Sequence, residues 1–103
     1  MNKTKIKFLL QTANDNISNL ANKFLDAEFF NCVDLSYWWN PSKEWWSNRK
    51  SAEIALKVLE QENCCIRVAG EGEAMYQKTT EFIILLNQII RIENHLNRGR
   101  NDD

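Results

Sequence analysis

The sequence is poor in the residues that most catalytic and cofactor-binding motifs require. It contains one histidine, His95, and only three glycines and one proline. The glycines, Gly70, Gly72 and Gly99, open neither a phosphate-binding loop nor a dinucleotide-binding pattern. A nucleophilic cysteine needs a basic partner, and a single histidine without a recognisable motif supplies weak support for one. We therefore expect a protein that is not an enzyme and that uses no cofactor.

Cysteine is also scarce. The three cysteines are Cys32, Cys64 and Cys65, an odd number without a C-x-x-C pair, so neither a disulfide framework nor a zinc site is indicated. Free cysteine is among the most buried residue types. We expect three buried structural thiols and no metal site.

Long hydrophobic runs are missing. The longest, Phe82–Leu86, is far too short to cross a bilayer, which argues against a membrane partner. The lysines near the N-terminus precede only the short apolar stretch Phe8–Leu10, which does not form a signal peptide. These two observations predict a cytoplasmic protein.

Neither sign of charge is in excess. The chain has 13 basic and 14 acidic residues and a formal net charge of −1. Proteins that bind long nucleic acids usually carry a basic surplus, so we expect no binding of that kind. A few local cations could still hold one small anionic ligand. The length of 103 residues and the ordinary hydrophobic content of 44% predict a single globular domain over residues 1–103.

The first part of the chain has the periodicity of an amphipathic helix. Apolar residues recur at three- and four-residue steps from about residue 4 to about residue 30, which predicts a helix over that range. Its weak point is Asn14–Asn16, because these side chains can bond to nearby backbone and break the helix in two.

A second helix is predicted after the only proline. Asn40 and Pro41 form a strong start signal, with Asn40 as the N-cap, and Gly70 is a plausible stop. The segment Cys64–Val68 has some β character, but we find no second run that could pair with it. Since a lone strand would leave its backbone groups unsatisfied, we place it in the helix or in a loop.

The last helix is expected from about Glu73 to Asn97, after a turn at Gly70–Glu73, and residues 98–103 form a polar tail. Its apolar residues cover so wide an arc that we expect it to be buried against more than one neighbour, or to form half of an oligomer interface. The predicted fold class is all-α, a compact bundle of three to five helices with a buried C-terminal helix.

The most informative segment is Tyr37–Trp46, which contains all four tryptophans as two adjacent pairs. Neighbouring residues on a helix point about 100° apart, so both rings of a pair cannot enter the same core. We expect one ring of each pair to be partly exposed. Cations follow the rings closely. The predicted binding residues are Tyr37, Trp38, Trp39, Lys43, Trp45, Trp46, Arg49 and Lys50.

Two functions fit this surface. Exposed tryptophan and tyrosine beside arginine are typical of a protein–protein hot spot. This favours a small interaction protein of the inhibitor, immunity or phage-type host-modulating kind, and the Asn-, Lys- and Ile-rich composition suggests a bacterial or phage source. Alternatively, the rings stack on the bases of a signalling nucleotide or of a single strand. The surplus of apolar residues further predicts a homo-oligomer.

Overall fold

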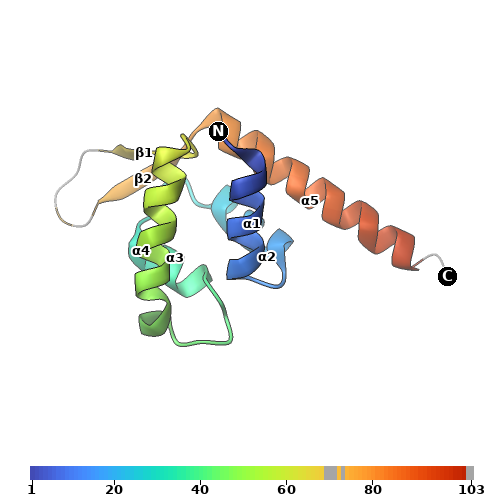
Figure 1. Ribbon diagram of the computed structural model, residues 1–103, viewed down its shortest axis with the longest axis horizontal. Helices are drawn as coiled ribbons and strands as arrows, with labels where there is room; N and C mark the ends of the chain where they lie inside the picture. Colours follow the sequence, from blue (N-terminus) through green and yellow to red (C-terminus); the bar gives the residue numbers. More distant parts are fainter. Residues whose placement is uncertain (69–71, 73, 102–103) are drawn as a thin grey trace.

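The computed structural model describes residues 1–68, 72 and 74–101, which form five α-helices and one two-stranded sheet (Figure 1). The helices are α1 (Lys3–Ala13), α2 (Ile17–Asp26), α3 (Cys32–Trp38), α4 (Trp45–Gln61) and α5 (Thr80–Asn101). The strands β1 (Cys65–Val68) and β2 (Met75–Lys78) lie between α4 and α5. The predominantly helical fold is confirmed, whereas the prediction of a purely all-α protein is wrong.

The prediction of one helix over residues 4–30 is wrong, because the chain breaks at the weak point Asn14–Asn16 into α1 and α2, and α2 ends at Asp26. The Asn14 side chain accepts a hydrogen bond from the Asn16 backbone N–H at 2.9 Å. The Asn16 side chain then caps α2 by accepting from the Asn19 N–H at 3.1 Å. Because both asparagines satisfy backbone donors at a helix end, the apolar stripe continues on two helices instead of one.

Helix α3 is an element that the periodicity does not predict. It begins with a capping box, in which the Asn31 side chain accepts from the Asp34 N–H at 2.9 Å. The Asp34 carboxylate accepts from the Asn31 N–H at 3.0 Å in return. Two backbone donors are satisfied by this exchange, which allows a helix of only seven residues to start here.

The predicted start of the next helix at Asn40 is wrong. Asn40 has a φ of 28°, in the left-handed region that asparagine tolerates better than most residues, and it follows the end of α3. Its backbone N–H donates to the Ala13 carbonyl at 2.8 Å, which ties this turn to the end of α1. Helix α4 starts only at Trp45, after Glu44.

Helix α4 ends at Gln61 and not at Gly70, which lies outside the described residues. Asn63 takes the left-handed conformation, with a φ of 62°. The Cys64 N–H donates to the Leu59 carbonyl at 2.8 Å and the Asn63 N–H to the Glu60 carbonyl at 3.1 Å. This pair of bonds is a Schellman motif, with asparagine where glycine is more usual.

The segment Cys65–Val68 is a strand, contrary to the prediction, because Met75–Lys78 pairs with it as an antiparallel partner. The prediction that the last helix begins at about Glu73 is wrong for the same reason, since Met75–Lys78 is this strand. Tyr76 of β2 also forms an isolated bridge with Phe30, through backbone hydrogen bonds of 2.8 and 3.0 Å. Strand β2 therefore has β1 on one side and, at Tyr76, the backbone of Phe30 on the other. Of the predicted turn at Gly70–Glu73, only Gly72 is described, with a φ of +87°.

Helix α5 starts at Thr80 and continues to Asn101, so the part of the predicted polar tail that is described is helical. The residues of α5 that are buried occupy one face of its first half: Phe82, Leu85, Leu86 and Ile89. Figure 1 shows the rest of α5 running away from the other helices. Exposed Ile83, Ile84, Ile92 and Leu96 show that α5 is not buried on several sides within one chain, while its role as half of an oligomer interface stays a prediction.

The core is organised around Phe24 of α2, which is completely buried. Its ring meets Phe30, Trp38 and Phe82 edge to face, with ring centroids 5.3 to 5.4 Å apart. Edge-to-face pairs of this kind add to the stabilisation that burial supplies. Phe24 thereby links α2, the segment before α3, the end of α3 and α5 in one aromatic cluster.

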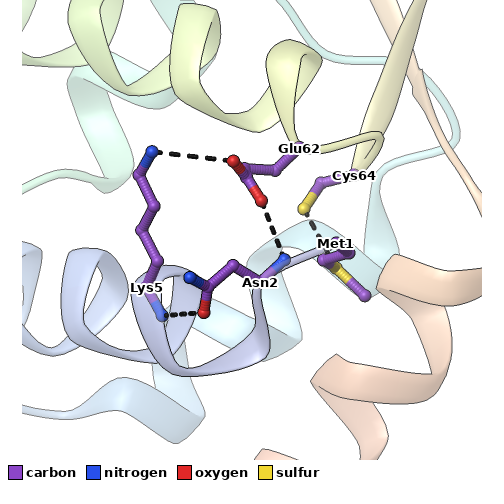
Figure 2. Close-up of polar contacts among 5 residues, drawn as sticks. All are labelled: Met1, Asn2, Lys5, Glu62 and Cys64. Carbon is purple, nitrogen blue, oxygen red and sulfur yellow. Dashed lines mark hydrogen bonds and ion pairs between the residues drawn. The ribbon is translucent and has the colours of Figure 1, made fainter.

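The N-terminus is attached to the end of α4 (Figure 2). The Glu62 carboxylate accepts from the Asn2 backbone N–H at 2.8 Å and lies 3.6 Å from the Lys5 ammonium. The Asn2 hydrogen bond is the main reason why the pKa of Glu62 is lowered. Beside it, the Cys64 thiol donates to the Met1 thioether across 3.3 Å. Cys64 and its neighbour Cys65 are both buried, as the prediction of structural thiols requires.

The buried thiols make stability sensitive to alkali. Burial raises the pKa of both Cys64 and Cys65 from 9.0 to about 12. The unfolded chain releases these protons above pH 9 while the folded chain keeps them, so stability that is fully present below pH 9 is lost as the pH rises toward 12. Each thiol should lower the free energy of unfolding by about 1.4 kcal/mol per pH unit in that window.

Urea denaturation at a series of pH values measures this slope. Cys65→Ala should remove one thiol's share of the slope, whatever it does to stability at neutral pH. An unchanged slope would show that Cys65 does not resist ionisation in the folded protein.

Candidate functional site

Helix α3, the turn at 39–44 and helix α4 form a helix–turn–helix unit that is held together by Asn48. This side chain is buried and comes from the first turn of α4. Its amide nitrogen lies 3.1 Å from the Ser36 carbonyl, 2.5 Å from the Trp39 carbonyl and 3.2 Å from the Asn40 carbonyl. An amide group has two N–H donors, so three carbonyls at the end of α3 share them. The start of α4 is thereby fixed against the end of α3.

One face of α4 packs on the core and the opposite face is open to solvent. Ala52, Ala55, Leu56 and Leu59 are buried on the inner face together with Asn48. A helical repeat of 100° per residue puts Lys50 opposite this face. The outer face of α4, as we use the term, comprises exposed Trp46, Ser47, Lys50, Ile54 and Lys57.

The tryptophan pairs divide between core and surface. Trp39 is buried, with 6% of its area exposed, and Trp38 is half-buried against Phe24. In the second pair, Trp45 is half-buried whereas Trp46 is 61% exposed. The structure therefore places Trp38 and Trp39 in or against the core, and leaves Trp45 and Trp46 available at the start of α4.

Tyr37, Trp45 and Trp46 form an aromatic cluster on the surface. Tyr37, at the end of α3, is 60% exposed and stacks on Trp45 with ring centroids 5.6 Å apart and an interplanar angle of 24°. Trp46 meets Trp45 edge to face at 5.9 Å. Each ring is held by contact with a neighbouring ring. The cluster is therefore an apolar surface whose side chains need not lose further conformational freedom when a partner binds.

The predicted cations lie beside this cluster, but they are not equivalent. Lys43 and Lys50 are exposed, in the turn and on the outer face of α4 respectively. Arg49 forms an ion pair with Glu53 one helical turn later, at 3.6 Å. Lys50 is therefore the cation best placed to meet an anionic ligand from the outer face of α4.

The β-hairpin lies beside α4 and forms a groove with it. The groove is lined by Cys32, Glu53, Leu56, Lys57, Glu60, Arg67, Ala74 and Tyr76. Arg67 on β1 lies over the Tyr76 ring, 5.7 Å from its centroid, and donates to the Tyr76 hydroxyl at 3.2 Å. This hydrogen bond is the main reason why the pKa of Arg67 is raised. The groove thus carries basic and acidic groups side by side.

Sequence analysis missed Asn48 and Lys57 as contributors to this site. Nothing in the sequence marks Asn48, since its role depends on the turn that α3 creates. Lys57 could have been found, because it follows Lys50 by seven residues and so shares its helical face. The only histidine, His95, is exposed on α5, away from this site.

Other types of site find no support in the part of the chain that the structure describes. No three His, Cys, Asp or Glu side chains there gather as a metal ion would need. None of the helices within residues 1–68 and 74–101 combines the length and hydropathy that crossing a bilayer requires. Comparisons with protein-family models, curated proteins and solved structures find no significant match to this chain.

Replacing Asn48 should test the helix–turn–helix junction. Asn48→Asp keeps the size of the side chain but puts a carboxylate oxygen where an N–H donor meets three carbonyls. We expect the free energy of unfolding to fall by about 3 kcal/mol, more than for Asn48→Ala, because a buried charge without a donor costs more than a lost hydrogen bond. Equal stability of Asn48→Asp and the unmodified protein in urea would contradict this role.

The four tryptophans should separate into two behaviours in denaturation experiments. Trp39→Ala removes a buried ring and should cost about 3–5 kcal/mol of stability. Trp46→Ala removes a ring that is mostly exposed, so the melting temperature should hardly change. Unfolding of the Trp46→Ala variant would mean that this ring belongs to the core.

Proposed function

We propose that this protein binds double-stranded DNA and places the outer face of α4 in the major groove. The observation that carries the proposal is the order of elements: α3, a turn and α4, followed directly by the β1–β2 hairpin. In helix-turn-helix proteins the second helix of the pair is the one that enters the major groove. A hairpin after that helix is the arrangement of winged helix-turn-helix domains. The resemblance lies in topology, so the function is argued below from the residues.

The outer face of α4 has the groups that base and phosphate contacts use. Lys50 and Lys57 supply exposed ammonium groups on one face, and Ser47 supplies an exposed hydroxyl. The exposed ring of Trp46 can contact a thymine methyl group. Helix α4 has 17 residues, about 25 Å in length, and a single helix fits the major groove.

Net charge is the strongest argument against this proposal. At −1 it gives no general attraction for DNA, and Glu53 and Glu60 are exposed on α4 beside the lysines. Phosphate binding depends on local charge, however, and Lys43, Lys50 and Lys57 face solvent around the proposed contact. Three phosphate contacts predict a slope of about −2.7 for the logarithm of affinity against the logarithm of salt concentration.

The test starts with duplexes of randomised sequence, from which the protein enriches those that it binds. Affinity for an enriched duplex is then measured by fluorescence anisotropy at several salt concentrations. Lys50→Ala should weaken binding about tenfold and make the salt slope shallower by about one. Lys23→Ala is the matched control, because Lys23 is an exposed lysine on α2, outside this face.

Absence of any enriched duplex would contradict the proposal. So would equal losses for Lys50→Ala and Lys23→Ala, which would show that binding reflects overall charge and not the outer face of α4.

A protein partner is the second candidate, and the exposed aromatic cluster favours it. Tyr37 and Trp46 each expose about 60% of their area, and both rings contact the ring of Trp45. Exposed aromatic anchors of this kind dominate protein interfaces. In that case Tyr37→Ala and Trp46→Ala abolish binding while Lys50→Ala matters little.

A nucleotide or single strand on the same rings would instead give saturable quenching of Trp46 fluorescence by mononucleotides or short oligonucleotides.

A further inference from the structure

Helix α5 carries a row of half-exposed side chains in which two isoleucines flank one glutamine, and the isoleucines border side chains of the N-terminal segment such as Lys3 and Lys7. Ile84, Gln88 and Ile92 follow one another at four-residue steps and so lie along one side of the helix. Ile84 and Ile92 are 50% and 48% exposed, and Gln88 between them is half-buried. The face that packs on the core is a different one, formed by Phe82, Leu85, Leu86 and Ile89.

The row is symmetric about Gln88, and this symmetry suits a second copy of the same helix. If a second α5 lies antiparallel with Gln88 opposite Gln88, Ile84 of each copy meets Ile92 of the other. The two glutamine amides can donate to and accept from one another, since each has both kinds of group. A two-fold axis through Gln88 therefore matches apolar with apolar and polar with polar.

The polar groups at the ends of the row fit the same arrangement, because an imidazole N–H can donate to a carboxylate. Glu81 and His95 lie seven residues before and after Gln88, and both are exposed. The antiparallel register places the Glu81 carboxylate of one copy beside the His95 imidazole of the other. A parallel register would instead set Glu81 against Glu81, and like charges at facing positions are unfavourable.

The helix has room for such a partner. Its 22 residues correspond to about 33 Å, and Figure 1 shows its second half extending beyond the other helices. Leu96, at 51% exposure, lies one four-residue step beyond Ile92, and in this register it faces Thr80 of the other copy. A symmetric interface uses the same patch on both copies, which is the commonest way for a soluble protein to cover such a surface.

We propose that two copies of this chain form an antiparallel dimer through the Ile84–Gln88–Ile92 row of α5, with the two-fold axis at Gln88. The dimer does not depend on the DNA-binding proposal, and each can fail without the other.

Cysteine cross-linking of the full chain tests the register. Gln88→Cys should form a disulfide-linked dimer under mild oxidation, because the axis brings the two positions together. Ile84→Cys and Ile92→Cys should each stay largely unlinked alone and should link when the two proteins are mixed. The native thiols Cys32, Cys64 and Cys65 are buried, and Ile66→Cys, at an exposed position of β1, is the control that should not link.

Sedimentation tests the surface independently of any cysteine. The unmodified protein should sediment as a dimer, and Ile92→Glu should raise the dissociation constant at least tenfold without a change in helical content by circular dichroism. Ile54→Glu, at an equally exposed isoleucine on α4, should leave the dimer intact. A monomeric unmodified protein, equal effects of both glutamates, or self-linking of Ile84→Cys as efficient as its linking to Ile92→Cys would overturn the proposal.

Discussion

The buried amide of Asn48 is the interaction on which the presentation of α4 depends. It lies within 3.2 Å of the carbonyls of Ser36, Trp39 and Asn40, where α3 ends and the turn begins. Carbonyls at a helix end have no partner within the helix, and burying them without one is costly. A side chain of α4 supplies the partner, so the end of one helix and the start of the next cannot move independently.

This junction also explains why adjacent tryptophans have different roles. Trp39 follows α3 directly and is turned into the core, while Trp38 packs on Phe24. Trp45 and Trp46 come after the turn, at the start of α4. Trp45 lies on the same side of the helix as Ala52 and Leu56 and is half-buried, whereas Trp46 points about 100° away from it and is 61% exposed. Trp38 and Trp39 thus pack in or against the core before the turn, whereas Trp46 is exposed on the surface of α4.

The two proposals combine in a simple geometric way. A two-fold axis through α5 would give each dimer two copies of α4, related by symmetry. Dimeric helix-turn-helix proteins use such a pair to bind two half-sites about one turn of DNA apart, and the symmetry of the protein is repeated in the sequence of the site. Two weak contacts on one duplex would also offset the low net charge of a single chain, because the second contact forms at high effective concentration.

Periodicity and local signals predicted part of this structure. The apolar stripe predicted helical structure from about residue 4, and Asn14–Asn16 marked where it could break, but not that it would end as two helices at Asp26. The two tryptophan pairs indicated that some rings would be exposed. The hairpin escaped prediction because its two strands are short and β2 carries no marked apolar alternation. The pairing of β2 with β1 and with Phe30 depends on tertiary structure and not on a local sequence signal. The predicted N-cap at Asn40 was wrong because asparagine is common at both ends of helices. Only its positive φ shows that Asn40 follows the end of α3.

The capping box at Asn31 and Asp34 was present in the sequence and could have revealed α3. With α3 known, the helix–turn–helix unit would have followed. The role of Asn48 could not have been predicted, because its three acceptors come from residues whose positions are set by the turn itself.

The most direct test of the central claim is an NMR titration of the labelled protein with an enriched duplex. If α4 is presented by the Asn48 junction as the binding helix, the largest amide shift changes should fall on residues 43–57, with those of α5 nearly unchanged. Shift changes concentrated on α5, or none on the outer face of α4, would contradict the account.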